Sequence, residues 1–160
     1  MESQSNTAPI MNTTTDRSLA TLTHLSTLSQ YIFPFGNFIL PIVIWSSARK
    51  NSEFMDSHGK EAINFQLSIF LYTIGLALIA VPILLFSVLR NVPFAEIIDG
   101  SELGNHLSMG NITGIAIVAL VAILLFAILK VAEFFLVIVA SVKASNGEPF
   151  KYPLTIRFIK

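Results

Sequence analysis

Three long stretches without a charged residue occupy most of this chain. They cover residues 18–48, 62–89 and 103–129, and apolar sequence resumes from Phe134 to Val142. A bilayer core of roughly 30 Å needs about 20 helical residues, so each stretch is long enough to cross it. The sequence therefore predicts a helical integral membrane protein.

Composition narrows the class further. The chain is 53% hydrophobic and 12% charged, whereas a soluble domain carries about 25% charged residues. Ten basic residues balance ten acidic ones, so general attraction to nucleic acid has no support. Cysteine is absent, which excludes disulfides and thiolate chemistry. The first 17 residues are polar and lack the positive start of a signal peptide, so we expect a disordered arm there.

The expected fold is all-α, a small bundle of three transmembrane helices in one membrane domain over residues 18–160. The spans are predicted at about 31–48, 62–89 and 112–142, with an ordered cytoplasmic tail over 143–160. The first stretch begins as an amphipathic helix with an uncharged polar face and is broken at Pro34–Asn37. This stretch either crosses the membrane or folds back at the break as a hairpin, and both alternatives remain open.

Basic residues predict the orientation. The segment 49–61 and the tail together hold seven of the ten Lys and Arg residues. The acidic loop that starts at Arg90 holds one basic residue, Arg90 itself. The positive-inside rule therefore places the segment 49–61 and the C-terminus in the cytoplasm, whether or not the first stretch crosses. The tail alternates apolar and polar residues after Tyr152-Pro153, which predicts an extended segment docked against residues 49–61.

Polar residues in the apolar stretches are the candidate functional residues. Glu61, Asn64, Ser68 and Tyr72 follow each other at three or four residues, so they share one face of the second long helix. Such a face either bonds to neighbouring helices or a partner, with Glu61 pairing with Arg49 or Lys60, or lines a path for a solute.

One charged pair interrupts the third helix. Lys130 and Glu133 lie one turn apart, either at the membrane interface or inside the membrane against a partner helix or water. His58 and Glu61 resemble half of a metal motif, but His24 is expected at another depth, so no metal site and no other cofactor is predicted. Hydrolase and nucleotide-binding motifs are absent from the sequence.

Several segments together carry a family resemblance. They are residues 22–26, 34–37, 40–45, 58–66, 142–148 and 151–156, and their most distinctive members are His58, Gly59, Asn64, Phe65, Asn146, Gly147, Tyr152 and Pro153. This pattern resembles a widespread bacterial family of small membrane proteins of unknown function. That family is distantly similar to the Tic-twenty subunit of the chloroplast inner-envelope protein translocon.

The resemblance implies a multi-pass protein of the bacterial inner membrane. Together with the polar face and the charged pair, it indicates a non-catalytic subunit of a larger membrane assembly, with a possible link to protein translocation. The expected partners are the lipid bilayer and other membrane subunits. The alternative is a homo-oligomeric channel or small-solute transporter lined by the polar face of the second helix.

Overall fold

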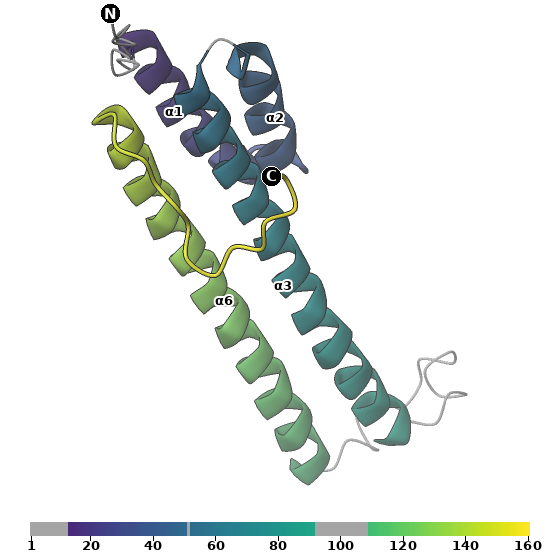
Figure 1. The fold of residues 1–160 in the computed structure, drawn as a ribbon. Coiled ribbons are helices and arrows are strands. Elements are labelled where there is room, and N and C mark those ends of the chain that lie inside the picture. Colours follow the sequence, from purple (N-terminus) through teal and green to yellow (C-terminus); the bar gives the residue numbers. More distant parts are fainter. Residues whose placement is uncertain (1–12, 51, 92–108) are drawn as a thin grey trace, which may run out of the picture. The chain divides into compact units, whose positions relative to one another are not determined.

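All regular elements in the described part of the chain are helices. The computed structural model describes residues 13–50, 52–91 and 109–160 (Figure 1). In chain order the elements are α1 (Thr14–Ser26), the short 3-10 helix η1 (Thr27–Tyr31), α2 (Gly36–Ala48), α3 (Glu53–Asn91) and α6 (Met109–Ser145). The all-α prediction is confirmed for these residues.

Two of the helices are long and apolar enough to cross a membrane. They are α3, over Glu53–Ser87, and α6, over Thr113–Ser145. The helices extend beyond the spans expected at 62–89 and 112–142, and α3 continues through Pro82. A third transmembrane helix over residues 31–48 is not confirmed, because α2 has only 13 residues.

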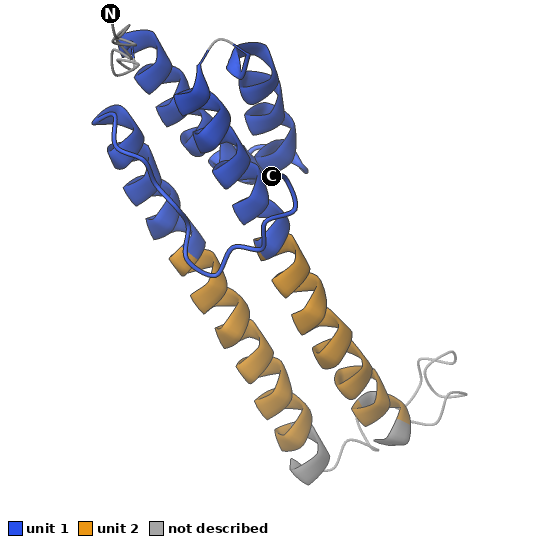
Figure 2. Cartoon of the chain, viewed as in Figure 1, with its two compact units in different colours: residues 1–68, 133–160 blue, residues 69–132 orange. Residues whose placement is uncertain are grey.

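The chain divides into two compact units, which are coloured separately in Figure 2. Unit 1 comprises residues 1–68 and 133–160, and unit 2 comprises residues 69–132. The described residues of unit 2 belong to the apolar parts of α3 and α6, and many of their large side chains, such as Leu78 and Leu120, are exposed. Because such side chains avoid water, their exposure along both helices indicates contact with lipid.

Helix α1 begins at a capping box. The Thr13 hydroxyl accepts a hydrogen bond from the Asp16 backbone N–H (3.1 Å), and the Asp16 carboxylate accepts one from the Thr13 N–H (3.1 Å). This reciprocal pair satisfies two backbone donors at the helix start. The start lies inside the segment 1–17 that the sequence assigned to the arm, and residues 1–12 lie outside the described part of the chain.

The chain folds back between η1 and α2. Helices α1 and α2 contact each other and lie side by side in Figure 1, running in opposite directions. Phe35 adopts the left-handed conformation (φ 62°) at the start of α2, and Gly36 packs so closely on Ser29 that a side chain there would collide with the Ser29 backbone. The first stretch therefore folds back as a hairpin in unit 1, which is one of the two alternatives that the sequence left open.

Helix α6 ends where the sequence predicted, at Asn146-Gly147. Gly147 has φ 76°, its N–H bonds to the Ala144 carbonyl, and the Glu148 N–H bonds to the Lys143 carbonyl. This is a Schellman motif, which satisfies the last carbonyls of the helix. The following residues form neither helix nor strand, and they run back along unit 1 towards α3 (Figure 1).

Replacing Gly147 with alanine should destabilise the protein. The left-handed conformation costs a residue with a side chain about 1–2 kcal/mol, and the added Cβ would lie 2.7 Å from Arg17 Nε. Gly114→Ala is the matched control, since its Cβ would meet nothing within 4 Å. Thermal unfolding in mild detergent should show a lower midpoint for Gly147→Ala alone. Equal midpoints for the two variants would contradict the role of this turn.

Candidate functional site

Two histidines and a tyrosine form a hydrogen-bonded chain inside unit 1. His24 Nδ1 lies 3.0 Å from the Tyr152 hydroxyl, and His24 Nε2 lies 2.9 Å from His58 Nδ1. Both imidazoles are fully enclosed. The three side chains come from α1, α3 and the tail, so the chain joins three segments distant in sequence. The expectation that His24 lies at another depth from His58 is therefore wrong.

The directions of these hydrogen bonds are coupled. A neutral imidazole has one donor and one acceptor nitrogen. If the Tyr152 hydroxyl donates to His24, then His24 donates to His58, and His58 carries its proton on Nε2. That nitrogen faces the backbone of Glu148 without reaching hydrogen-bond geometry.

Burial keeps His24 and Tyr152 in their neutral forms. Burial, followed by the repulsion from His58, lowers the pKa of His24 to about 3. Burial also raises the pKa of Tyr152 well above its usual value, and the carboxylates of Glu133 and Glu61 add to the effect. A general acid or base works best with a pKa near the operating pH. At neutral pH, therefore, His24 and Tyr152 form an uncharged hydrogen-bonded network.

Asn64 and Ser68 hold the tail by its backbone. The Asn64 side-chain oxygen accepts hydrogen bonds from the N–H groups of Phe158 (3.1 Å) and Ile159 (2.8 Å), and its amide group donates to the Ile159 carbonyl (2.9 Å). The Ser68 hydroxyl accepts a hydrogen bond from the Ile156 N–H (2.9 Å). The two buried side chains therefore bind an extended segment much as a neighbouring strand would.

The predicted polar face of α3 divides at the end of unit 1. Glu61 accepts a hydrogen bond from the Tyr152 N–H (3.3 Å) and lies 3.8 Å from the Arg157 guanidinium. Glu61 was expected to pair with Arg49 or Lys60, but Arg49 lies over the Trp45 ring and Lys60 forms an ion pair with Asp56. Tyr72 belongs to unit 2 and is 37% exposed, so it does not share the environment of the other three residues.

The tail was expected to be an extended segment against residues 49–61. It is extended, but its contacts lie further along α3, at Asn64 and Ser68 as well as Glu61. Its alternating apolar side chains, Leu154 among them, are exposed. Backbone groups rather than these side chains hold the tail.

Aromatic contacts close the site around the histidines. The Tyr152 ring stacks on Phe65 (centroids 4.0 Å apart), and His58 contacts Phe54 (4.3 Å). Gly59 packs directly against the Trp45 ring, where any side chain would collide. Trp45 is buried, and its ring N–H donates a hydrogen bond to Asp56.

Unit 1 brings most of the distinctive sequence positions together. His58, Gly59, Asn64, Phe65 and Tyr152 all contribute to this site. Pro153 follows Tyr152 and is exposed, whereas Asn146 and Gly147 serve to end α6.

Two further polar contacts attach the α1–α2 hairpin to the long helices. Gln30 donates a hydrogen bond to the fully buried Glu133 carboxylate of α6 (2.8 Å), and Asn37 donates one to Gln66 of α3 (2.8 Å). Sequence analysis missed Gln30, Asn37 and Gln66 as site residues. The predicted partner of Glu133, Lys130, belongs to unit 2 and lies 5.9 Å from the Phe126 ring centroid.

The described residues contain no group of three or more His, Cys, Asp or Glu side chains arranged to hold a metal ion. The two close histidines face each other through a hydrogen bond instead. The site as described is an internal polar network.

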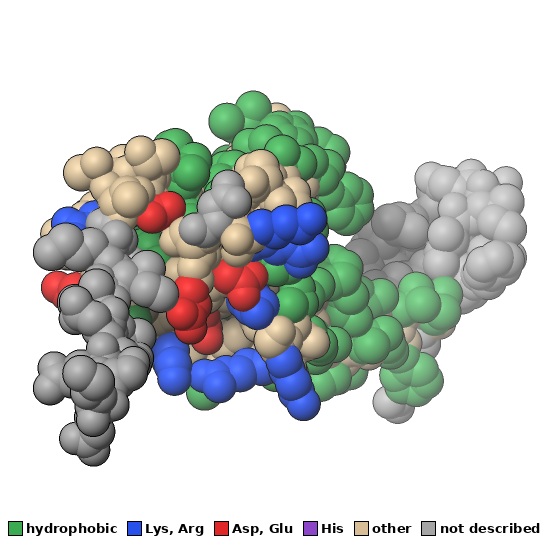
Figure 3. All heavy atoms as spheres, turned by 45° about the horizontal axis from the view of Figure 1, so that its top comes forward, with side chains coloured by type: hydrophobic (Ala, Val, Ile, Leu, Met, Phe, Trp, Pro, Cys, Tyr) green, Lys and Arg blue, Asp and Glu red, His purple; other side chains and the backbone are tan. Residues whose placement is uncertain are grey.

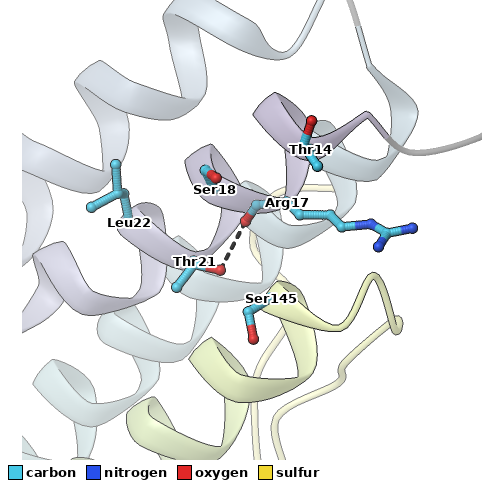
Figure 4. Close-up of a pocket in the computed structure, with 6 residues that line it drawn as sticks. All are labelled: Thr14, Arg17, Ser18, Thr21, Leu22 and Ser145. Atoms are coloured by element: carbon cyan, nitrogen blue, oxygen red, sulfur yellow. Dashed lines mark hydrogen bonds between the residues drawn. The ribbon is translucent and has the colours of Figure 1, made fainter.

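A second candidate is a surface pocket of about 460 Å³ (Figure 4). Its lining residues are Thr14, Arg17, Ser18, Thr21 and Leu22 of α1 and Ser145 of α6. The Thr21 and Ser145 hydroxyls bond to carbonyls of their own helices. The Arg17 side chain extends towards the turn at Gly147. Because these groups serve the helix ends, the buried network is the stronger candidate.

Comparison with known families identifies the chain's relatives. Residues 15–159 match the model of the magnetosome magnetite crystal formation protein family, MamF/MmsF. Because this match covers well over half of the chain, the protein belongs to that family. The resemblance to a Tic-twenty-like family was therefore wrong, and a link to protein translocation has no support. No curated protein and no solved structure matches the chain.

Acid should destabilise the fold through His24. Its pKa is about 3 in the folded chain against 6.5 for a free side chain, so the unfolded state binds more protons between these values. Stability is therefore present above pH 6.5 and is lost as the pH falls below it. At about pH 5 the loss is about 2 kcal/mol. His24→Gln should show a shallower fall in thermal midpoint on acidification, and an unchanged slope would contradict this account.

Replacing Asn64 with leucine should release the tail. The change removes three hydrogen bonds to residues 158–159 and leaves their backbone groups unpaired, at a cost of about 1–3 kcal/mol. Trypsin should then cut faster after Lys151 and Arg157 in detergent. Asn64→Asp keeps the acceptor oxygens and should fall between the wild type and Asn64→Leu. Equal cutting rates in all three proteins would argue against the clamp.

Proposed function

We propose that this member of the magnetosome magnetite crystal formation family is a non-catalytic integral membrane protein that takes part in forming the crystal. The observation that carries the proposal is the distribution of polarity. Buried side chains of unit 1 include His24, His58, Gln66 and Glu133, while large apolar side chains are exposed in both units. A surface of this kind suits lipid, because polar groups in a membrane must pair inside the protein.

We infer that α3 and α6 cross the membrane and that the α1–α2 hairpin does not. Within unit 1, the start of α1, the start of α3 and the end of α6 lie at one end (Figure 1). This arrangement supports a common side for Arg17, the segment 49–61 and the tail, with eight basic residues against Arg90 at the other end of α3. By the positive-inside rule the eight lie in the cytoplasm.

Charged side chains gather close together on one face, beside exposed hydrophobic side chains (Figure 3). Ion pairs of unit 1 link Lys60 with Asp56, Lys143 with Glu148 and Arg157 with Glu61. In this topology, that face meets the cytoplasm. The loop between α3 and α6, acidic in sequence with Glu96, Asp99 and Glu102, then faces the side where the crystal forms. Residues 92–108 lie outside the described part of the chain.

The contacts of the polar face favour this proposal over a channel. Asn64 and Ser68 are buried and engaged by the tail, so a solute has no access to them in this conformation. Their role is to hold unit 1 together. The neutral state of His24 and Tyr152 likewise favours a structural role over a catalytic one.

The topology can be tested with single cysteines, because the chain has none of its own. Ser145→Cys is exposed at the end of α6, and Ser101→Cys lies in the acidic loop. In intact magnetosomes collected with a magnet, an impermeant thiol reagent should label Ser145→Cys and should reach Ser101→Cys only after detergent is added. The reverse pattern, or absence of the protein from these vesicles, would overturn the proposed topology or location.

The role in crystal formation needs a separate experiment. Deleting the gene in a magnetosome-forming cell should change the size or shape of the crystals seen by electron microscopy, and the wild-type gene should restore them. Asn64→Leu, with its tail released, should restore them less well than Asn64→Asp. Unchanged crystals in the deletion strain would refute a role for this protein.

A further inference from the structure

Helix α2 is too short to cross a bilayer. Its 13 residues span roughly 20 Å, against a hydrocarbon core of roughly 30 Å. Yet its sequence, GNFILPIVIWSSA, is apolar almost throughout. Outward-facing side chains such as Ile39, Ile42 and Val43 are exposed. The helix therefore presents an apolar surface about two thirds as long as the hydrocarbon core is thick.

The tip of the α1–α2 hairpin is also apolar and exposed. We define the hairpin tip as residues 31–35, Tyr31-Ile-Phe-Pro-Phe35, and Ile32 is 85% exposed while Phe35 is 64% exposed. Polar neighbours of the tip point the other way, since Ser29 is buried, Gln30 bonds to Glu133 and Asn37 bonds to Gln66. The tip therefore turns its polar groups towards protein and its apolar groups outward.

The open end of the hairpin has the opposite character. Helix α2 ends near Trp45, whose ring NH bonds to Asp56, and the Arg49 guanidinium lies 4.7 Å from the centre of the Trp45 ring. Arg49 and Lys50 are exposed. A basic end and an apolar tip, roughly 20 Å apart along α2, fit the headgroups and the hydrocarbon part of one leaflet.

We propose that the α1–α2 hairpin is a wedge that inserts into the cytoplasmic leaflet alone, with its tip in the hydrocarbon part of that leaflet. The partner of this surface is therefore lipid. An element that adds area to one leaflet and none to the other favours membranes that are convex on that side. The inference rests on the proposed topology and extends it, because it gives the protein a preference for small vesicles whose cytoplasmic face is convex.

Spin labels on single cysteines test the depth of the tip. In reconstituted protein, a label on Ile32→Cys should be accessible to oxygen and protected from a water-soluble nickel reagent, with a depth inside the hydrocarbon part of the cytoplasmic leaflet. A label on Ser145→Cys should be accessible to the nickel reagent. A tip at the headgroups of the far leaflet would mean that α2 crosses, and a tip in water would mean that the hairpin lies outside. Either result overturns the wedge.

Single-vesicle fluorescence tests the curvature preference. Protein labelled on Ser145→Cys is reconstituted into a mixture of small and large vesicles, and molecules whose label is quenched from outside are counted per membrane area. The wild type should be denser on small vesicles. Equal density on both sizes overturns the inference even if the cysteine labelling in magnetosomes supports the proposed topology.

Matched charge variants connect the two measurements. Ile32→Asp with Phe35→Asp should expel the tip from the membrane and abolish the preference for small vesicles. Leu154→Asp is the control, because Leu154 is as exposed as Ile32 (85%) but lies on the tail. It should behave as the wild type does. A tip variant that keeps the preference, or a control that loses it, would show that another surface senses curvature.

Discussion

The need to pair polar groups away from lipid governs unit 1. A buried polar group without a partner costs several kcal/mol in a membrane. Unit 1 contains many buried polar side chains, so their hydrogen-bond partners matter. The chain from Tyr152 through His24 to His58 links α1, α3 and the tail, and the Gln30–Glu133 and Asn37–Gln66 contacts attach the hairpin. Apolar packing alone would not select these contacts, since lipid competes for apolar surfaces. Hydrogen bonds therefore specify how the segments of unit 1 meet.

The tail completes this arrangement from the far end of the chain. Asn64 and Ser68 would expose polar groups on one face of α3 if the tail did not cover them. Backbone N–H groups of the tail donate hydrogen bonds to both side chains. The side chains of α3 and the backbone of the tail thus supply each other's hydrogen-bond partners. The side chains of Leu154 and Phe158 stay exposed. The polar stripe is consequently an intramolecular binding site for backbone rather than a path for solute.

Local signals in the sequence predicted the local structure well. The uncharged stretches identified α3 and α6, and Asn146-Gly147 identified the end of α6, because helix length and capping depend on neighbouring residues. The return of the chain at residues 31–35 was left open, since an apolar stretch interrupted by Pro34 suits either a crossing or a hairpin. The contact between His24 and His58 was missed for the same reason. Depth was judged as if the first stretch crossed, and the hairpin brings the two rings together.

The hairpin also explains why the polar and apolar residues of the first stretch are arranged as they are. Thr23, Thr27 and Ser29 are buried, and their hydroxyls donate to backbone carbonyls of α1 three or four residues earlier in the chain, while Leu22 and Ile32 are exposed. In a water-soluble protein the polar residues would face outward and the apolar residues inward, which is the opposite of this pattern. The pattern suits a lipid leaflet, because the hydroxyl groups are enclosed with their acceptors and the apolar side chains face outward towards acyl chains. The amphipathic pattern and the fold-back at Phe35 therefore both suit the insertion that we propose, with this segment entering from one side of the membrane.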